Sequence, residues 1–90
     1  MKDPRYKAIK SLIEAKGITR FKDIFTIVPL TVVKRDMKIN YNTLRSRVNK
    51  VETLTFKDII TMADLFEVNA IDIFHLILND IGSNNKGRKK

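Results

Sequence analysis

Residues 30–50 read LTVVKRDMKINYNTLRSRVNK, and this stretch predicts two short helices joined by a tight turn at residues 38–40. Asn40 is a suitable N-cap for the second helix, which we expect over residues 41–50. Helical spacing places Leu44 and Val48 on one side of that helix, with Tyr41 in the same sector. The opposite side is polar and carries Asn42, Ser46, Asn49 and Lys50. The stretch therefore predicts one buried and one solvent-facing helix side.

Helical spacing of apolar residues recurs along the rest of the chain. Further helices are expected over residues 4–16, 20–28, 32–37, 56–67 and 70–81. No alternation typical of a strand is present. The sequence predicts an all-α protein, a compact bundle of five to six short helices. We expect a single domain over residues 1–82, with its central helix pair at residues 31–50, and a flexible basic tail over residues 83–90.

Residues typical of helix ends support these limits. Caps are expected at helix starts from Asp3, Thr19, Thr31, Asn69 and the pair Thr55 and Asp58. Glycines are expected to end two helices, at Gly17 and Gly82. The inward stripe of the fifth helix is expected to be Phe56, Ile59, Met62, Ala63 and Phe66. That of the sixth is expected to be Ala70, Ile71, Phe74, Ile77, Leu78 and Ile81.

Charge is distributed unevenly along this chain of net charge +8. Residues 1–50 carry 13 Lys/Arg against 4 Asp/Glu, a net charge of +9. Residues 51–82 carry one against six, a net charge of −5, and residues 83–90 carry four against none. The basic part also holds the helix pair of residues 31–50. This distribution favours a surface that binds a polyanion, although charge that only keeps the protein in solution is the alternative.

Several classes of function have no support in the sequence. The chain has no cysteine, and the lone His75 has no partner ligands, so neither a metal site nor a cofactor is expected. The carboxylates of Asp64, Glu67, Asp72 and Asp80 are expected on outer helix faces or at helix caps. No phosphate-binding glycine loop and no nucleophile with a base are present, so an enzyme is not expected. Without a signal peptide or an apolar run of spanning length, we expect a cytoplasmic protein, at the nucleoid, with no membrane contact.

The runs MKINYNTLRSRVNK (residues 37–50) and TLTFKDIITMADLFEVNAIDIF (residues 53–74) carry a family pattern. In order and spacing they resemble the phage-repressor/Cro-type helix-turn-helix family, also called XRE-like or lambda-repressor-like. The features are an apolar helix with Ile59, Ala63 and Phe66, a glutamate-valine junction ending at Val68, and a last helix. The resemblance implies a lambda-repressor-like fold in which the helix at 41–50 reads DNA.

Two departures from the family pattern are visible. The family usually has a small residue within the first helix of the pair and a glycine at the turn, where this chain has Lys34 and Lys38. A lysine in the left-handed conformation of the usual turn costs about 1 kcal/mol. About ten extra residues precede the helix pair, in the segment TRFKDIFTIVPLTVV (residues 19–33). This segment looks like a variant found in small bacterial regulators.

The resemblance and the charge together predict a sequence-specific, DNA-binding transcriptional regulator. Its second helix would enter the major groove of double-stranded DNA. Asn42 is suited to paired hydrogen bonds with adenine, and Arg45 to guanine or a phosphate. The expected DNA-binding residues are Thr31, Lys34, Arg35, Lys38, Asn40, Tyr41, Asn42, Thr43, Arg45, Ser46, Arg47, Asn49 and Lys50. The tail residues Lys86, Arg88, Lys89 and Lys90 are expected either to add backbone contacts or to remain a solubilising end.

Family members usually bind as homodimers on two half-sites, and surplus apolar residues fit such a contact. Ile73 and Leu76 lie outside the expected stripe of the last helix, and Leu65 lies outside that of the helix before it. We expect these three residues at a dimer interface. The alternative is that the inserted segment covers them within one chain.

A second function remains open from sequence alone. The same fold can serve as an antitoxin-like or adaptor module that binds a protein partner through the acidic part, residues 51–82. The apolar last helix supports this alternative. RNA binding is less favoured, because no exposed aromatic platform is expected.

Overall fold

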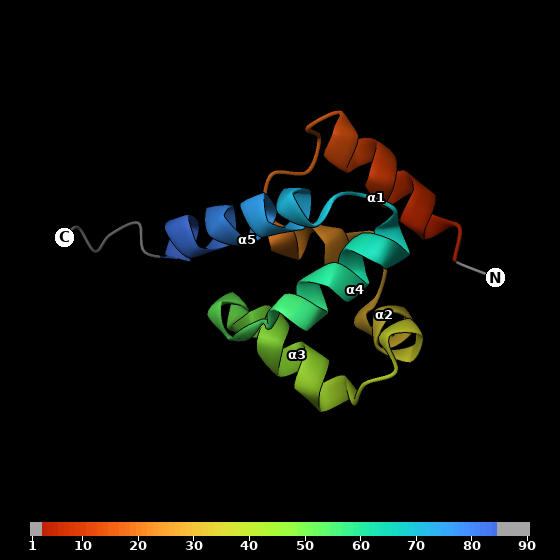
Figure 1. Cartoon of the computed structure of the whole chain (residues 1–90), viewed down its shortest axis with the longest axis vertical. Helices are drawn as coiled ribbons and strands as arrows, with labels where there is room; N and C mark the ends of the chain where they lie inside the picture. Colours follow the sequence, from red (N-terminus) through yellow and green to blue (C-terminus); the bar gives the residue numbers. More distant parts are fainter. Residues whose placement is uncertain (1–2, 85–90) are drawn as a thin grey trace.

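The computed structural model describes residues 3–84, with side chains to residue 82, and all regular secondary structure in this part of the chain is helical. It contains five α-helices and two 3₁₀ segments, with no strand in the described range. The elements are α1 (Arg5–Glu14), η1 (Phe21–Thr26), α2 (Leu30–Met37), α3 (Tyr41–Asn49), η2 (Val51–Thr53), α4 (Phe56–Phe66) and α5 (Ala70–Asn84). The expected all-α bundle is confirmed (Figure 1).

The core forms around α4, which runs between α1 and the pair α2 and α3 (Figure 1). Each element contributes apolar side chains that are almost inaccessible to solvent. The largest of them are Phe21, Phe66, Ile9, Ile24, Leu44, Met62 and Ile73. Helix α5 packs along α4 and against η1 and η2. Helix α3 thus lies at one edge of the molecule, on the far side of α4 from α1.

The start of most helices agrees with the sequence. Asp3, the expected cap of the first helix, lies one residue before the N-cap Pro4 of α1, and its Oδ1 accepts the backbone N–H of Arg5 at 2.9 Å. Asn40 is the N-cap of α3 as expected, and its Oδ1 accepts the backbone N–H of Asn42 at 2.8 Å. Thr55 and Asp58 form the expected capping box, in which each side chain accepts the other's backbone N–H at 3.1 Å. These contacts satisfy N–H groups that no helical carbonyl reaches.

The inserted segment differs from expectation. Residues 20–28 do not form an α-helix with Thr19 as its cap; instead η1 covers Phe21–Thr26 and Arg20 precedes it. Two hydrogen bonds join this segment to α5. Buried Asp80 accepts the backbone N–H of Lys22 at 3.0 Å, and Asn79 Nδ2 donates to the carbonyl of Thr19 at 2.6 Å. The expectation that Asp80 lies on an outer face was therefore wrong.

Three helices end in the same motif, each with a non-glycine residue in the left-handed region. These residues are Lys16, Lys38 and Glu67, with φ of 62°, 61° and 58°. After each of them the next N–H donates to the carbonyl four residues before the left-handed residue: Gly17 to Leu12, Ile39 to Lys34, and Val68 to Ala63. This is the Schellman pattern. The strained turn expected at Lys38 is confirmed, whereas Gly17 is not the left-handed residue of its turn.

Two other helix limits were misplaced. Helix α2 begins at Leu30, after the extended Pro29, so Thr31 lies in its first turn and does not cap it. Helix α5 continues through Gly82 to Asn84. A glycine within a helix costs only about 1 kcal/mol, too little to stop it. Residues 85–90, which include the basic tail residues, lie outside the described range.

The inward faces of α4 and α5 also differ from expectation. Phe56 is 81% exposed, and Ile71, Phe74 and Leu78 are exposed as well. Ile73 and Leu76 are buried instead. The buried side of α5 is therefore rotated relative to the stripe expected for the sixth helix, because α5 also packs against η1.

This rotation removes Ile73 and Leu76 from the expected dimer contact. Ile73 is 0% and Leu76 is 5% exposed, and Leu76 lies beside Ile13 and Ile18. Leu65 is partly buried against the core. Ile73 and Leu76 are both covered within one chain, where α5 packs against η1 of the inserted segment and Leu76 also lies beside Ile13 and Ile18.

Candidate nucleic-acid interface

Helix α3 separates its residues into two sides. Leu44 and Val48 are buried, and the Asn40 cap fixes where the helix begins. The opposite side is exposed and polar, with Asn42, Arg45, Ser46 and Asn49. Tyr41, expected on the inward side, is 38% exposed at the first turn. This outer side is open to a ligand along its whole length.

The candidate DNA-binding residues fall into two groups by exposure. Exposed are Thr31, Arg35, Lys38, Asn40, Tyr41, Asn42, Arg45, Ser46, Asn49 and Lys50. Partly buried are Lys34, Thr43 and Arg47. Helices α2 and α3 pack against each other. The structure thus gathers most of these side chains around one helix pair, with Thr31 at the opposite end of α2 from the turn.

The electrostatic character of the pair is strongly positive. Residues 37–51 contain no Asp or Glu, and Asp36 is the one acid between residues 30 and 51. No ion pair within residues 3–84 engages Lys34, Lys38, Arg45 or Lys50. Their charge is therefore not cancelled by a carboxylate of the described chain, and a polyanion near α3 meets several cations.

Arg47 has a different role. Its Nη1 donates to both carboxylate oxygens of Asp58 in α4, at 3.1 and 2.8 Å. The Asp58 side chain is 8% exposed and that of Arg47 is 32% exposed. A buried carboxylate that loses its cation is costly, so this pair holds α3 against the start of α4. We therefore assign Arg47 to positioning α3 and not to phosphate binding.

A second clamp positions α2. The Tyr6 hydroxyl of α1 donates to Asp36 Oδ2 at 2.6 Å, and Arg35 Nε donates to Asp36 Oδ1 at 3.1 Å. The hydrogen bond from Arg35, followed by that from Tyr6, lowers the pKa of Asp36. Burial, followed by the bond to Asp36, raises the pKa of Tyr6. Arg35 is exposed but paired with Asp36, so it offers less uncompensated positive charge than Arg45.

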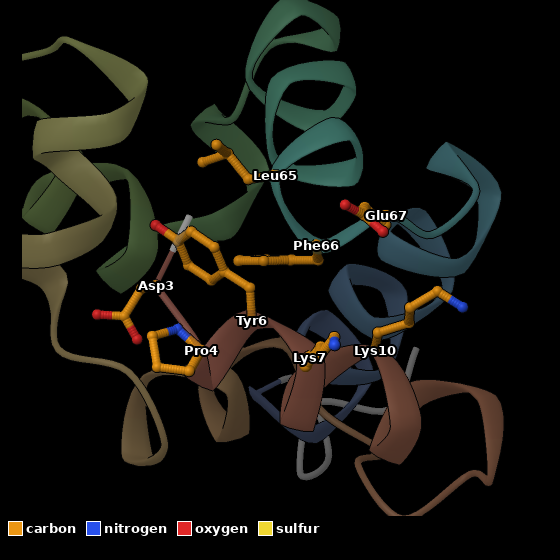
Figure 2. A pocket seen from close by; sticks show the side chains of 8 residues that line it. All are labelled: Asp3, Pro4, Tyr6, Lys7, Lys10, Leu65, Phe66 and Glu67. Atoms are coloured by element: carbon orange, nitrogen blue, oxygen red, sulfur yellow. The ribbon is translucent and has the colours of Figure 1, made fainter. Parts of the chain in front are cut away.

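The same Tyr6 forms part of a crevice of about 260 Å³ between α1 and the end of α4. Its ring packs on Phe66, with centroids 5.3 Å apart, and Figure 2 shows the two rings against each other. Lys7 and Lys10 stand at one end and Asp3 at the other (Figure 2). Lys10 is paired with Glu14 at 2.8 Å. The crevice thus has charges of both signs over an aromatic floor, and it lies apart from α3.

Sequence reasoning missed a hollow of about 490 Å³ beside the turn of the helix pair. It lies between that turn and the start of α4, and it is lined by Met37, Lys38, Ile39, Arg47, Thr55, Lys57, Asp58 and Thr61. Lys57 is exposed and is the single cation of residues 51–82. Because Lys57 is the single cation of an acidic stretch, the sequence alone could have singled it out as a candidate contact. Lys57 therefore joins Lys38 as a candidate contact for a backbone phosphate.

No group of three or more metal-ligating side chains occurs within residues 3–84. None of the helices in this range combines the length and the hydropathy needed to cross a membrane.

Comparison with known proteins gave no match to a family model, to a curated protein or to a solved structure. The likeness to phage-repressor helix-turn-helix proteins therefore rests on the residues quoted from the sequence.

Proposed function

We propose that this protein binds double-stranded DNA as a transcriptional regulator, with α3 as the helix that enters the major groove. One observation carries the proposal. The exposed side of α3 presents amide, hydroxyl and guanidinium groups, and no acid lies within residues 37–51. Such a helix, rigidly seated through Leu44 and Val48, meets the steric and electrostatic demands of groove reading.

Each exposed group has a role that follows from its chemistry. The amide of Asn42 can donate to and accept from adenine, and Arg45 can donate twice to guanine. Lys38, Lys50 and Lys57 are placed to neutralise phosphates, which releases counterions. The first turn of α2, around Thr31, offers backbone N–H groups for another phosphate.

A binding assay with labelled random duplex at low salt tests the proposal. We expect binding that weakens as salt rises, because affinity from phosphate contacts depends on counterion release. Arg45→Ala should weaken it and lower the slope of log affinity against log salt by about 1 if Arg45 meets a phosphate. Lys7→Ala is the matched control, since it removes an exposed cation on α1. Equal effects of both substitutions would indicate only attraction between opposite net charges.

Specificity needs a separate experiment. Selection of bound duplexes from a random pool should recover a common motif, because base-edge contacts distinguish sequences whereas phosphate contacts do not. Absence of any duplex binding at low salt would contradict the proposal. That result would favour the adaptor or antitoxin-like module, whose contact surface would lie on α4 and α5.

A further inference from the structure

Five large apolar side chains are exposed on α4 and α5, the two helices that pack along each other. We call them the α4–α5 apolar surface: Phe56, Ile60, Ile71, Phe74 and Leu78. Phe56 is 81% exposed, and Ile60 and Ile71 are 55% and 54% exposed. Exposed apolar groups scattered singly are ordinary, but a contiguous group of this kind marks a contact site.

Two adjoining hollows make this surface a groove. The first has a volume of about 410 Å³, and its lining is entirely apolar: Phe56, Ile59, Ile60, Ala70, Ile71 and Phe74. The second, of about 230 Å³, shares Phe56, Ile59 and Phe74 with the first and reaches Ile81 near the end of α5. At about 1.5 Å per helical residue, the groove between Ala70 and Ile81 is about 16 Å long.

The apolar lining restricts the backbone conformation of an occupant. An extended segment has N–H and C=O groups without partners of its own, and apolar side chains that cover these groups leave them unsatisfied. The described residues contain no strand to which such a segment could be added. A helix satisfies its backbone groups internally and presents only side chains to the groove. The lining therefore favours a helical occupant with one apolar side.

A single charged residue lines the two hollows. Glu52 of η2 borders the second hollow together with Phe56 and Leu78. It is exposed and forms no ion pair within residues 3–84. Lys57, the one cation of residues 51–82, lines the separate hollow beside the turn of the helix pair. The part of the groove at Glu52 is therefore acidic, and it attracts a cation of the occupant.

We propose that the α4–α5 apolar surface is the docking site for an amphipathic helix of a partner protein. Apolar side chains at positions i, i+4, i+7 and i+11 of that helix lie on one side and span about 16 Å. A lysine or arginine near one end of this apolar stripe pairs with Glu52. The inference goes beyond DNA binding and does not depend on it, because none of the lining residues belongs to α2 or α3.

The exposed area indicates the strength of this contact. Taking about 200 Å² for each large apolar side chain, the exposed fractions give on the order of 500 Å² on this chain. A helix that covers this area buries about 1,000 Å² in total, which is the size of a weak and reversible interface. We therefore expect a dissociation constant in the micromolar range.

Fluorescence anisotropy with a designed, labelled peptide as the probe tests the proposal. The probe has about 15 residues, a length at which an isolated helix begins to form. Leucine occupies positions i, i+4, i+7 and i+11, with alanine and glutamine elsewhere. Two versions, with arginine in the first or the last turn, cover both directions of the helix in the groove. The control peptide has the same composition, with its leucines distributed around the helix.

We expect one arginine version to bind with a dissociation constant of about 1–100 μM, at least tenfold more tightly than the control peptide. Phe56→Glu and Ile71→Glu should each raise this constant at least tenfold, because each removes an exposed apolar contact. The added carboxylate attracts the arginine of the probe, so the loss cannot be due to charge. Leu12→Glu is the matched control, since Leu12 is as exposed as Phe74 but lies on α1. Circular dichroism checks that each variant is folded.

Glu52→Lys tests the charge of the partner and leaves every apolar side chain of the groove in place. It should weaken binding of the arginine probe about threefold or more, because like charges repel. The same substitution should strengthen binding of a probe that carries glutamate in place of arginine. A Glu52→Lys variant that binds both probes as the wild type does would overturn the assigned partner chemistry.

The remaining outcomes also decide the question. The proposal is overturned if neither arginine version binds, or if the control peptide binds equally well. Binding that survives both Phe56→Glu and Ile71→Glu has the same consequence. Sedimentation of the wild type alone examines the other occupant. A mass of twice 10.4 kDa that both substitutions reduce would assign the surface to a second copy of this chain, against the proposal.

Discussion

Arg47 in α3 and Asp58 in α4 are joined by two hydrogen bonds from one guanidinium nitrogen, at 3.1 and 2.8 Å. Asp58 also accepts the backbone N–H of Thr55 at 3.1 Å, as part of the box that starts α4. One carboxylate therefore fixes the start of α4 and the seat of α3 together. The orientation of α3, the proposed reading helix, therefore depends on the Arg47–Asp58 pair, which lies outside the exposed polar side of α3.

The first prediction compares two arginines of the same helix. Arg47→Ala should lower the free energy of unfolding by about 2 kcal/mol, because it leaves buried Asp58 without its cation. This loss of stability is smaller than that expected for a fully buried ion pair, because the Arg47 side chain is about one-third exposed. Arg45→Ala should change it by less than about 0.5 kcal/mol. Urea unfolding measures both, and equal losses would contradict the separation of roles.

The second prediction separates base reading from phosphate binding. Asn42→Ala should reduce preference for one base of the selected motif by about 1–3 kcal/mol and leave the salt dependence unchanged. Lys50→Ala should weaken all duplexes alike and lower the salt slope by about 1. Titrations of matched and single-base-changed duplexes at several salt concentrations measure both effects. Identical behaviour of the two variants would argue against groove reading by α3.

The third prediction uses the left-handed residue of the turn. Lys38→Gly should raise the free energy of unfolding by up to about 1 kcal/mol, because glycine adopts a φ of 61° without the cost that lysine incurs. Lys34→Gly, in the interior of α2, should lower it by about 1 kcal/mol. The same replacement four residues apart thus has opposite signs. Thermal or urea unfolding of both variants gives the result, and a loss at Lys38 would refute it.

The starts of α3 and α4 were predictable because their determinants are local. Asn40 and the pair Thr55 and Asp58 bond to N–H groups two or three residues away, and these spacings are visible in the sequence. The left-handed residue at Lys38 was expected from the family resemblance, because Lys38 stands where the family usually has the glycine of the turn. Each of these features involves no more than six consecutive residues.

The face of α5 was not predictable, because apolar residues occupy nearly its whole circumference. Helical periodicity alone did not choose between the side with Ile71, Phe74 and Leu78 and the side with Ile73 and Leu76. The choice was made by η1, which packs against α5 from fifty residues away in the chain. No sequence feature within residues 70–84 indicates the contact between α5 and η1.

The roles of Arg45 and Arg47 were likewise indistinguishable in the sequence. The two residues lie two positions apart and flank the polar side of α3 equally. Only the folded position of Asp58 removes Arg47 from the exposed group. Long-range ion pairs of this kind decide which members of a basic stretch are available to a ligand.

The final prediction concerns Tyr6 and Asp36, which join α1 to α2 through a 2.6 Å hydrogen bond. Tyr6→Phe should lower the free energy of unfolding by about 1–2 kcal/mol at pH 7, since a buried hydroxyl no longer donates to a carboxylate. The Tyr6–Phe66 ring contact should remain, because the substitution keeps the ring. Leu12→Gln, on the exposed side of α1, serves as the control.

The pH dependence of that loss distinguishes the hydrogen bond from simple packing. The folded-state pKa of Asp36 is lowered below its ordinary value of 3.8, first by Arg35 and next by Tyr6. A carboxyl with a lowered pKa contributes stability above its ordinary value, and this contribution is lost as pH falls through the folded-state value. The difference in the free energy of unfolding between wild type and Tyr6→Phe should therefore be constant from pH 5 to 8 and become smaller below pH 3.8. Urea unfolding across this range measures it, and a difference that stays unchanged in acid would assign the loss to packing around Tyr6.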